Sequence, residues 1–193
     1  MKQIFKFYIL LILGFLSSNS FCQNYNHIVF EVYGDLNKDG LADLVLVKEE
    51  NKDKHNPFLL EIKFQEKDKS YRTVLSSETA VVDKFTGEDK ITICLLESIE
   101  IKKGILIFNQ SLIRGTFKHK FRFQKNNFEL IGIHFNSANP GYFLTVDYNL
   151  STGKMIEVKR AYETDKIIEE NITIEKITPL PNLKKFNPLD HLY

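Results

Sequence analysis

The sequence predicts an all-β protein, an antiparallel meander that forms a sandwich, a partly open barrel or a curved sheet. Polar and apolar residues alternate at a period of two in several segments, and turn residues recur at roughly the spacing of short strands. After the first 22 residues, no apolar repeat of helical period is long enough to predict a helix. We therefore expect few or no helices beyond that point.

The first expected strands are residues 27–33 and 44–47. Residues 44–47 are apolar on both faces, which is typical of a central strand. Residues 49–57 are charged and have no apolar period, so they are expected to form a loop. Residues 58–64 alternate clearly, and residues 71–75 form the expected return strand.

A second series of strands follows in the same pattern. The clearest is residues 115–124, in which aromatic residues and a histidine occupy one face and cations occupy the other. The expected strands are 91–96, 99–101, 105–108, 115–124, 128–135, 142–150, 154–162 and 172–177, with a short strand possible at 80–82. Residues 164–171 are expected to form a loop or a short helical turn.

The chain has 193 residues and a formal net charge of +1. This length suits one domain with a sizeable core. The near-neutral charge provides no global field for nucleic acid or an anionic membrane, so neither is an expected partner. We expect a single β domain over residues 23–178. Residues 179–193 carry three prolines and are expected to be an extended tail packed on the domain.

Residues 1–22 have the composition of a secretory signal peptide. Lys2 and Lys6 are followed by an apolar run over residues 7–16 and a short polar segment over residues 17–20. The run is too short for a helix that spans a bilayer. The protein is therefore expected to be periplasmic or secreted, without a stable membrane span after cleavage. An uncleaved N-terminal membrane anchor is the alternative.

Cleavage is expected after Cys22 or after Ser20. A lipoprotein anchored through Cys22 is a further alternative, although bulky Phe21 precedes that cysteine. Removal of Cys22 would leave Cys94 as the single thiol, so no intramolecular disulfide is expected. Cys94 lies in an apolar segment and is expected to be a buried hydrophobic residue, not a nucleophile.

One loop has the residue spacing of a calcium site. Oxygen-bearing side chains and a glycine alternate within it, and the candidate ligands are Asp35, Asn37, Asp39, the carbonyl of Leu41, and Asp43. Calcium binds six to eight oxygens, and Gly40 permits the sharp turn that brings them together. Leu46 stands where an EF-hand has glutamate, so an EF-hand is excluded. The alternative is a plain polar hairpin turn.

Residues 34–47 resemble the calcium loop and following strand of FG-GAP/VCBS-type repeats. Such repeats form the blades of β-propellers, but a propeller needs several copies and this chain has one. More loosely, the chain is similar to a family of small exported bacterial proteins of uncharacterised function that carry one such loop near the start. The resemblance implies one calcium ion, and it assigns no catalytic residues to this sequence.

Catalytic motifs are absent from the sequence: we find no paired metal-binding histidines, no Gly-x-Ser-x-Gly and no phosphate-binding glycine loop. His119 lies on an aromatic strand face and is expected to be a core residue. A site with His134, across the turn at residues 125–127, is the alternative. The row Lys118, Lys120 and Arg122 is expected to be a solvated face, and a surface for an acidic glycan or another anionic partner is the alternative. Tyr142 and Tyr148 are expected in the core, with sugar stacking as the alternative.

These observations favour an exported, calcium-stabilised β domain that acts as a binding or structural module for an unknown protein or glycan. An enzyme is the less favoured reading. A periplasmic or secreted hydrolase, whose acidic groups meet only in the folded chain, is one alternative. An exported inhibitor or immunity-type protein is the other.

Overall fold

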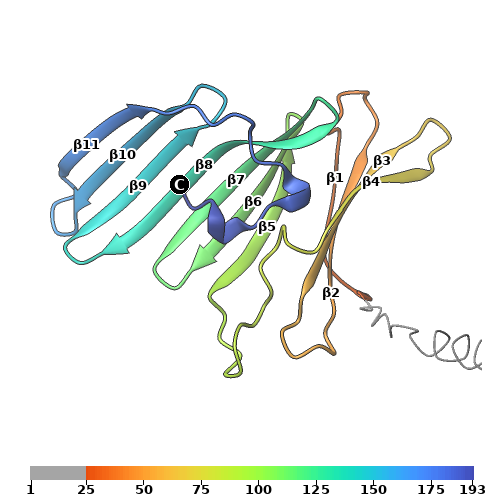
Figure 1. The fold of residues 1–193 in the computed structure, drawn as a ribbon, viewed down its shortest axis with the longest axis horizontal. Coiled ribbons are helices and arrows are strands. Elements are labelled where there is room, and N and C mark those ends of the chain that lie inside the picture. Colours follow the sequence, from red (N-terminus) through yellow and green to blue (C-terminus); the bar gives the residue numbers. More distant parts are fainter. Residues whose placement is uncertain (1–24) are drawn as a thin grey trace, which may run out of the picture.

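The structure is a computed structural model that describes residues 25–193 and contains two antiparallel β-sheets (Figure 1). The predicted signal peptide, its cleavage site and the alternatives for Cys22 lie outside these residues. In the first sheet the strands are β1 (His27–Gly34), β2 (Asp43–Glu49), β3 (Phe58–Gln65) and β4 (Tyr71–Ser77). In the second they are β5 (Cys94–Lys102), β6 (Ile105–Leu112), β7 (Gly115–Gln124), β8 (Asn127–Asn139), β9 (Tyr142–Asn149), β10 (Lys154–Ala161) and β11 (Ile167–Ile174). Two short 3₁₀ turns follow, η1 (Leu183–Lys185) and η2 (Pro188–Asp190).

Each strand pairs with its neighbours in the sequence, so both sheets are meanders. The small sheet has the order β1-β2-β3-β4, and the large sheet runs from β5 to β11 without a crossover. Neither sheet closes into a barrel. The prediction of an all-β antiparallel meander is confirmed. In the described part of the chain, no helix has the length and apolar character that crossing a membrane requires.

Three local expectations differ from the structure. Residues 91–96 and 99–101 were expected as two strands, whereas β5 is one strand with an irregularity between Leu96 and Ser98. Residues 80–82 form no strand, although Ala80 and Val81 are buried. Residues 164–171 were expected as a loop or helical turn, but β11 begins within them because pairing with β10 outweighs their polar composition.

The two sheets meet through one hydrophobic core and along the β1–β5 boundary (Figure 1). Phe64 of β3 packs edge-on against Phe123 of β7, with ring centroids 4.9 Å apart. At the boundary, Gly34 faces Ile101 of β5, and a Cβ on Gly34 would lie only 2.7 Å from the Ile101 side chain. Glycine at this position therefore lets the end of β1 approach the large sheet.

The large sheet has one covered and one uncovered face. The inner face carries Phe108, Phe117 and Phe121, each at most 1% exposed, and packs against the small sheet and the C-terminal segment. The outer face carries the cations of β7, because successive residues of a strand point to opposite faces. Alternation along β7 thus directs its aromatic side chains into the core and its cations to the outer surface.

The segment after β11 is part of the core. Leu183 and Phe186 are fully buried in the core shared by both sheets. The backbone N–H of Leu130 donates to the carbonyl of Pro181 at 2.9 Å, and the Ser77 hydroxyl donates to the carbonyl of Lys184 at 3.2 Å. Residues 181–186 therefore bridge β8 of the large sheet and β4 of the small one.

A chain of buried polar groups holds the end of this segment. The Cys94 thiol donates to Gln110 Oε1 at 3.5 Å, and Gln110 Nε2 lies 3.3 Å from His119 Nδ1. His119 Nε2 lies 2.6 Å from the carbonyl oxygen of His191, and the Phe186 ring packs edge-on against the His119 ring. Every contact is satisfied if neutral His119 carries its proton on Nε2. His119 is thus a core residue.

Burial lowers the pKa of His119 to about 4, and the bond to the His191 carbonyl only partly opposes this. The unfolded chain therefore binds the proton more readily than the folded chain between about pH 6.5 and about pH 4. The His119 contribution to stability is present above that window and is lost as the pH falls through it.

We expect this linkage to reduce the free energy of unfolding by about 3 kcal/mol between pH 7 and pH 4. Urea unfolding across that range, compared between the parent and His119→Gln, measures the effect. His191, whose pKa burial also lowers, is present in both proteins and cancels in the comparison. If the free energy of unfolding falls equally with pH in the two proteins, groups other than His119 cause the loss of stability.

Candidate functional site

The predicted calcium loop connects β1 to β2 and packs beside the β5–β6 turn. Lys38 and Gly40 have positive φ angles of 67° and 85°, so the backbone turns sharply at both positions. A Cβ on Gly104 of the neighbouring turn would lie 3.6 Å from the carbonyl oxygen of Asp35. The loop is therefore held against the large sheet as well as within its own hairpin.

Three loop side chains turn their oxygens toward backbone N–H groups of the same loop. Asp35 accepts from Lys38 at 2.6 Å and from Gly40 at 3.0 Å. Asn37 Oδ1 accepts from the N–H of Asp39 at 3.0 Å. Asp39 Oδ1 in turn accepts from the N–H of Leu41 at 2.8 Å. These bonds fix the loop. Asp35 Oδ1 also accepts from the N–H of Asp39 at 3.2 Å, so its two acceptor sites are filled, whereas Asp35 Oδ2, Asn37 Oδ1 and Asp39 Oδ1 each keep capacity for a further ligand.

Asp43 has a different environment from the other predicted ligands. It is fully buried, and its two carboxylate oxygens accept from the backbone N–H groups of Leu36 at 2.8 Å and Gln65 at 3.1 Å. Burial raises the pKa of its carboxyl, against the effect of these two bonds. Asp43 thus joins the loop to the end of β3.

The exposed part of the loop has the donor chemistry that calcium prefers. Asp35 and Asp39 supply carboxylates, Asn37 supplies an amide oxygen, and Leu41 can supply a carbonyl. Among residues 25–193, no group of three or more His, Cys, Asp or Glu side chains is arranged to hold a metal ion. The loop therefore offers two clustered carboxylates, with neutral oxygens completing the set.

A second candidate site lies on the outer face of the large sheet, where β8 is irregular. The register between β7 and β8 shifts between Lys120 and Phe121, which leaves Ile131 as an extra residue in β8. Gly132 follows and pairs with Lys120. A bulge bends its strand, and glycine adds no side chain, so the sheet is hollowed here. The hollow has a volume of about 460 Å³.

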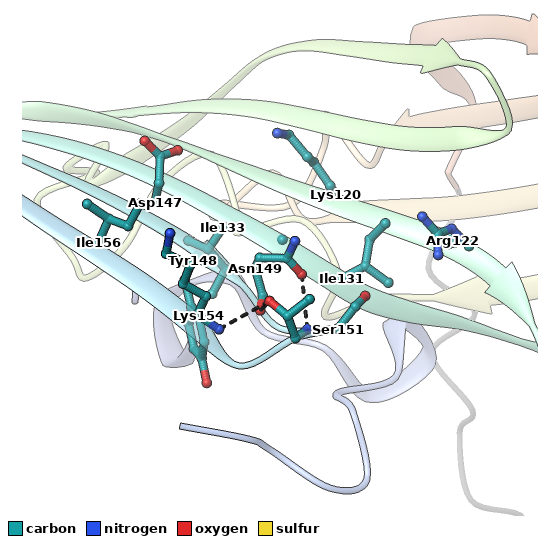
Figure 2. Close-up of a pocket in the computed structure, with 12 residues that line it drawn as sticks. Lys120, Arg122, Ile131, Ile133, Asp147, Tyr148, Asn149, Ser151, Lys154 and Ile156 are labelled. Carbon is teal, nitrogen blue, oxygen red and sulfur yellow. Dashed lines mark hydrogen bonds between the residues drawn. The ribbon is translucent and has the colours of Figure 1, made fainter. Parts of the chain in front are cut away.

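Three cations border this hollow (Figure 2). Lys120 and Arg122 come from β7, and Lys154 comes from the start of β10. Within residues 25–193, none of the three forms an ion pair or a side-chain hydrogen bond. Arg122 also borders an adjoining hollow of about 410 Å³, which Lys125 lines as well. We call these two adjoining hollows the outer groove.

Polar groups of the β9–β10 turn form one rim of the outer groove. The N–H of Thr152 donates to Asn149 Oδ1 at 3.2 Å, and the N–H of Lys154 donates to the Thr152 hydroxyl at 3.3 Å (Figure 2). Ser151, in the same turn, lines both hollows. These bonds set the turn in place, so hydroxyl and amide groups lie beside the cations.

The carboxylate in the larger hollow already has a partner. Asp147 lies 2.6 Å from His134 Nδ1, and the Asn136 amide nitrogen lies 3.0 Å from His134 Nε2. The Asn136 amide donates to Nε2, so Nδ1 carries the proton and donates to Asp147. The Nε2 lone pair is thereby occupied and is not presented to a substrate as a general base. Three cations thus outnumber the one carboxylate of the larger hollow, and Glu129, opposite Arg122 in the ladder, adds a carboxylate to the adjoining hollow.

The remaining candidates from the sequence are separated by the fold. His119 lies on the inner face and His134 on the outer face, so the sheet does not bring the two histidines together.

Tyr148 is buried and its hydroxyl donates to the Glu175 carbonyl at 2.7 Å. Tyr142 is half-buried on the edge of the second hydrophobic cluster. Burial raises the pKa of Cys94 to about 12, which disfavours a thiolate nucleophile.

The sequence pattern predicted two of the three cations that border the larger hollow. The alternation of β7 indicated the row that includes Lys120 and Arg122. It missed Lys154 and the rim residues, because their approach depends on the pairing of β8 with β9 and of β9 with β10. The bulge at Ile131 has no sequence signal except the glycine that follows it.

Comparison with known protein families, with curated proteins and with solved structures found no match for this chain.

We expect Asp43→Ala to lower the free energy of unfolding by about 2–4 kcal/mol, because the N–H groups of Leu36 and Gln65 would lose their acceptor. Asp39→Ala is the matched control in the same loop, and its effect should stay below about 1 kcal/mol, since Asp39 is exposed. Urea unfolding without added metal measures both. Equal losses of unfolding free energy in the two variants would contradict the role of Asp43 in joining the loop to the end of β3.

Proposed function

We propose that this protein is a non-enzymatic binding module that holds a segment of an acidic glycan in the outer groove. The observation that carries the proposal is the cluster of Lys120, Arg122 and Lys154, none of which forms an ion pair in the described chain. Unpaired cations at a concave surface attract anions, because a hollow in low-dielectric protein focuses their field. A carboxylate or sulfate group on the ligand would complete the missing ion pairs.

The remaining composition of the groove supports a sugar as the carrier of that charge. Asn149, Ser151 and Thr152 offer hydrogen-bonding groups suited to sugar hydroxyls, and Ile131 and Ile156 supply apolar surface beneath them. The two hollows adjoin at Arg122, so the groove is longer than a single small anion requires. This combination of few charges, several polar groups and an apolar floor is typical of ligand sites in proteins.

The proposal also includes export and one calcium ion. Asp35, Asn37, Asp39 and the Leu41 carbonyl would hold the ion, whose charge would draw together the oxygens of the β1–β2 loop. Outside the cytoplasm, calcium is plentiful enough for weak sites of this kind. Metal binding to the native state alone adds to stability in a chain whose one described cysteine is buried and free.

The glycan proposal predicts salt-dependent binding of sulfated or carboxylated oligosaccharides. Calorimetry with heparin fragments and with oligogalacturonate tests it, with neutral dextran and inorganic phosphate as comparison ligands. We expect Lys120→Ala combined with Arg122→Ala to weaken binding at least tenfold, since two charge-assisted contacts are lost. The matched control is Lys67→Ala, an exposed cation in the β3–β4 turn.

Equal binding by the groove variant and by the control would reject the outer groove as the site. If inorganic phosphate binds as tightly as the acidic oligosaccharides, the glycan proposal is rejected and the groove is only an anion site. Affinity that does not fall with added salt would contradict the role of the cations.

The calcium proposal predicts a higher melting temperature in 10 mM calcium than in chelator. With a dissociation constant of about 10⁻⁴–10⁻³ M, typical of extracellular modules, the stabilisation is about 1–3 kcal/mol. Asp35→Asn and Asp39→Ala should each abolish the difference between the two conditions. Asp68→Ala, in the β3–β4 turn, is the control that should preserve it. A calcium-independent melting temperature in the parent would overturn the proposal.

A further inference from the structure

A third hollow lies on the outer face of the large sheet, at the opposite end of β7 from the outer groove. It has a volume of about 510 Å³ and shares no lining residue with the groove. Gly115 begins β7, and a Cβ at this position would lie only 2.2 Å from the carbonyl oxygen of Asn136. Glycine thus lets the β6–β7 turn approach β8, and this turn brings Arg114 to the hollow.

Two arginines, Arg114 and Arg160, flank this site, which we call the arginine hollow. The N–H of Ala138 donates to the carbonyl of Arg114 at 2.8 Å. Ala138 pairs with Phe143, which in turn pairs with Arg160. Three strand spacings therefore separate the two arginine backbones, a distance of about 14 Å. A ligand placed over Phe143 would lie between the two guanidinium groups.

The arginines of this hollow form no ion pair within residues 25–193. Arg114 also forms no side-chain hydrogen bond there, and Arg160 donates one bond to the backbone carbonyl of Asp165 at 3.3 Å. Asp165 supplies the one carboxylate that lines the hollow. Because each guanidinium group has five N–H donors, most of these donors are available to a ligand.

An exposed aromatic ring forms the floor between the arginines. Phe143 is 47% exposed, and its ring packs edge-on against the Tyr162 ring with centroids 4.3 Å apart. This contact holds the Phe143 ring in place while leaving part of it open to a ligand. Thr116 and Thr145 add hydroxyl groups to the lining. The hollow thus combines apolar surface, hydrogen-bonding groups and two cations, as ligand sites commonly do.

Polar and cationic side chains connect the arginine hollow to the outer groove. Arg122, Lys120, Lys118 and Thr116 share the outer face of β7, because alternate residues of a strand point to the same side. Lys118 forms no ion pair in the described chain, although its charge contributes to the lowered pKa of Glu100. From Arg122 to the arginine hollow this row extends about 27 Å. A linear polyanion can follow it.

We propose that the arginine hollow is a second subsite for the acidic glycan and that it binds a uronic acid unit. The inference rests on the proposed function, because it extends the ligand of the outer groove along β7. The face of the sugar ring packs on Phe143, and its carboxylate accepts hydrogen bonds from Arg114 and Arg160.

The chemistry of the hollow favours a uronic acid over a sugar that carries sulfate. A guanidinium group matches a carboxylate through two parallel hydrogen bonds. In a uronic acid the carboxylate is attached directly to the ring, so one unit makes both the aromatic contact and the charge contact. The preferred glycan is therefore a linear polyuronate that is long enough to reach both sites.

Calorimetry with oligogalacturonates tests the second subsite. A fragment long enough to span both sites should bind the parent protein at least tenfold more tightly than one that covers a single site. Arg114→Gln and Phe143→Ala should each remove most of this gain. Arg72→Gln, which replaces an exposed arginine on β4 of the small sheet, is the matched control and should preserve it. Circular dichroism confirms that each variant is folded.

The outcomes separate this inference from the proposed function. If Arg114→Gln and Phe143→Ala bind the long fragment as tightly as the parent does, the second subsite is rejected. The proposed function still stands in that case if Lys120→Ala combined with Arg122→Ala weakens binding. Dextran sulfate of similar length is the comparison ligand. An equal loss of affinity for dextran sulfate in Arg114→Gln would show that the hollow responds to charge alone, and it would overturn the uronic acid assignment.

Discussion

The architecture depends on burial of one face of the large sheet. Phe108, Phe117 and Phe121 need a cover, and neither the small sheet nor the C-terminal segment alone supplies it. Apolar burial of this kind is the dominant favourable contribution to folding. Once the inner face is covered, strand alternation directs the cations of β7 outward. The position of the outer groove is thus a consequence of where the core lies.

The two polar regions of the molecule differ in how their charges are satisfied. In the β1–β2 loop, carboxylates accept hydrogen bonds from backbone N–H groups of the same loop, and these bonds order the backbone. In the outer groove, Lys120, Arg122 and Lys154 form no ion pair within the described chain, although Asp147 and Glu129 also line the groove. The first arrangement stabilises the loop, and the second leaves cations available to an anionic ligand. This contrast is why the groove, and not the loop, carries the proposed function.

Sequence patterns predicted much of the fold and only part of the candidate site. Period-two alternation identified most strands, since each strand has one buried face. It failed for β11, whose residues are all exposed and whose strand state comes from pairing with β10. Spacing identified the loop of Asp35 but could not show that Asp43 is buried beneath it. The groove depends on three strands and a bulge, and such contacts leave no local pattern.

The position of Leu183 and Phe186 also bears on the order of folding. These core residues follow all eleven strands of the described chain, and the Lys184 carbonyl accepts a hydrogen bond from Ser77, 107 positions earlier. Contacts between residues so far apart close late, because the loop entropy must be overcome first. A chain crossing a membrane in an extended state would therefore remain without its complete core until its final segment emerged. Late closure would leave such a chain unfolded enough to be transported, and it would also expose the apolar strands to aggregation for longer.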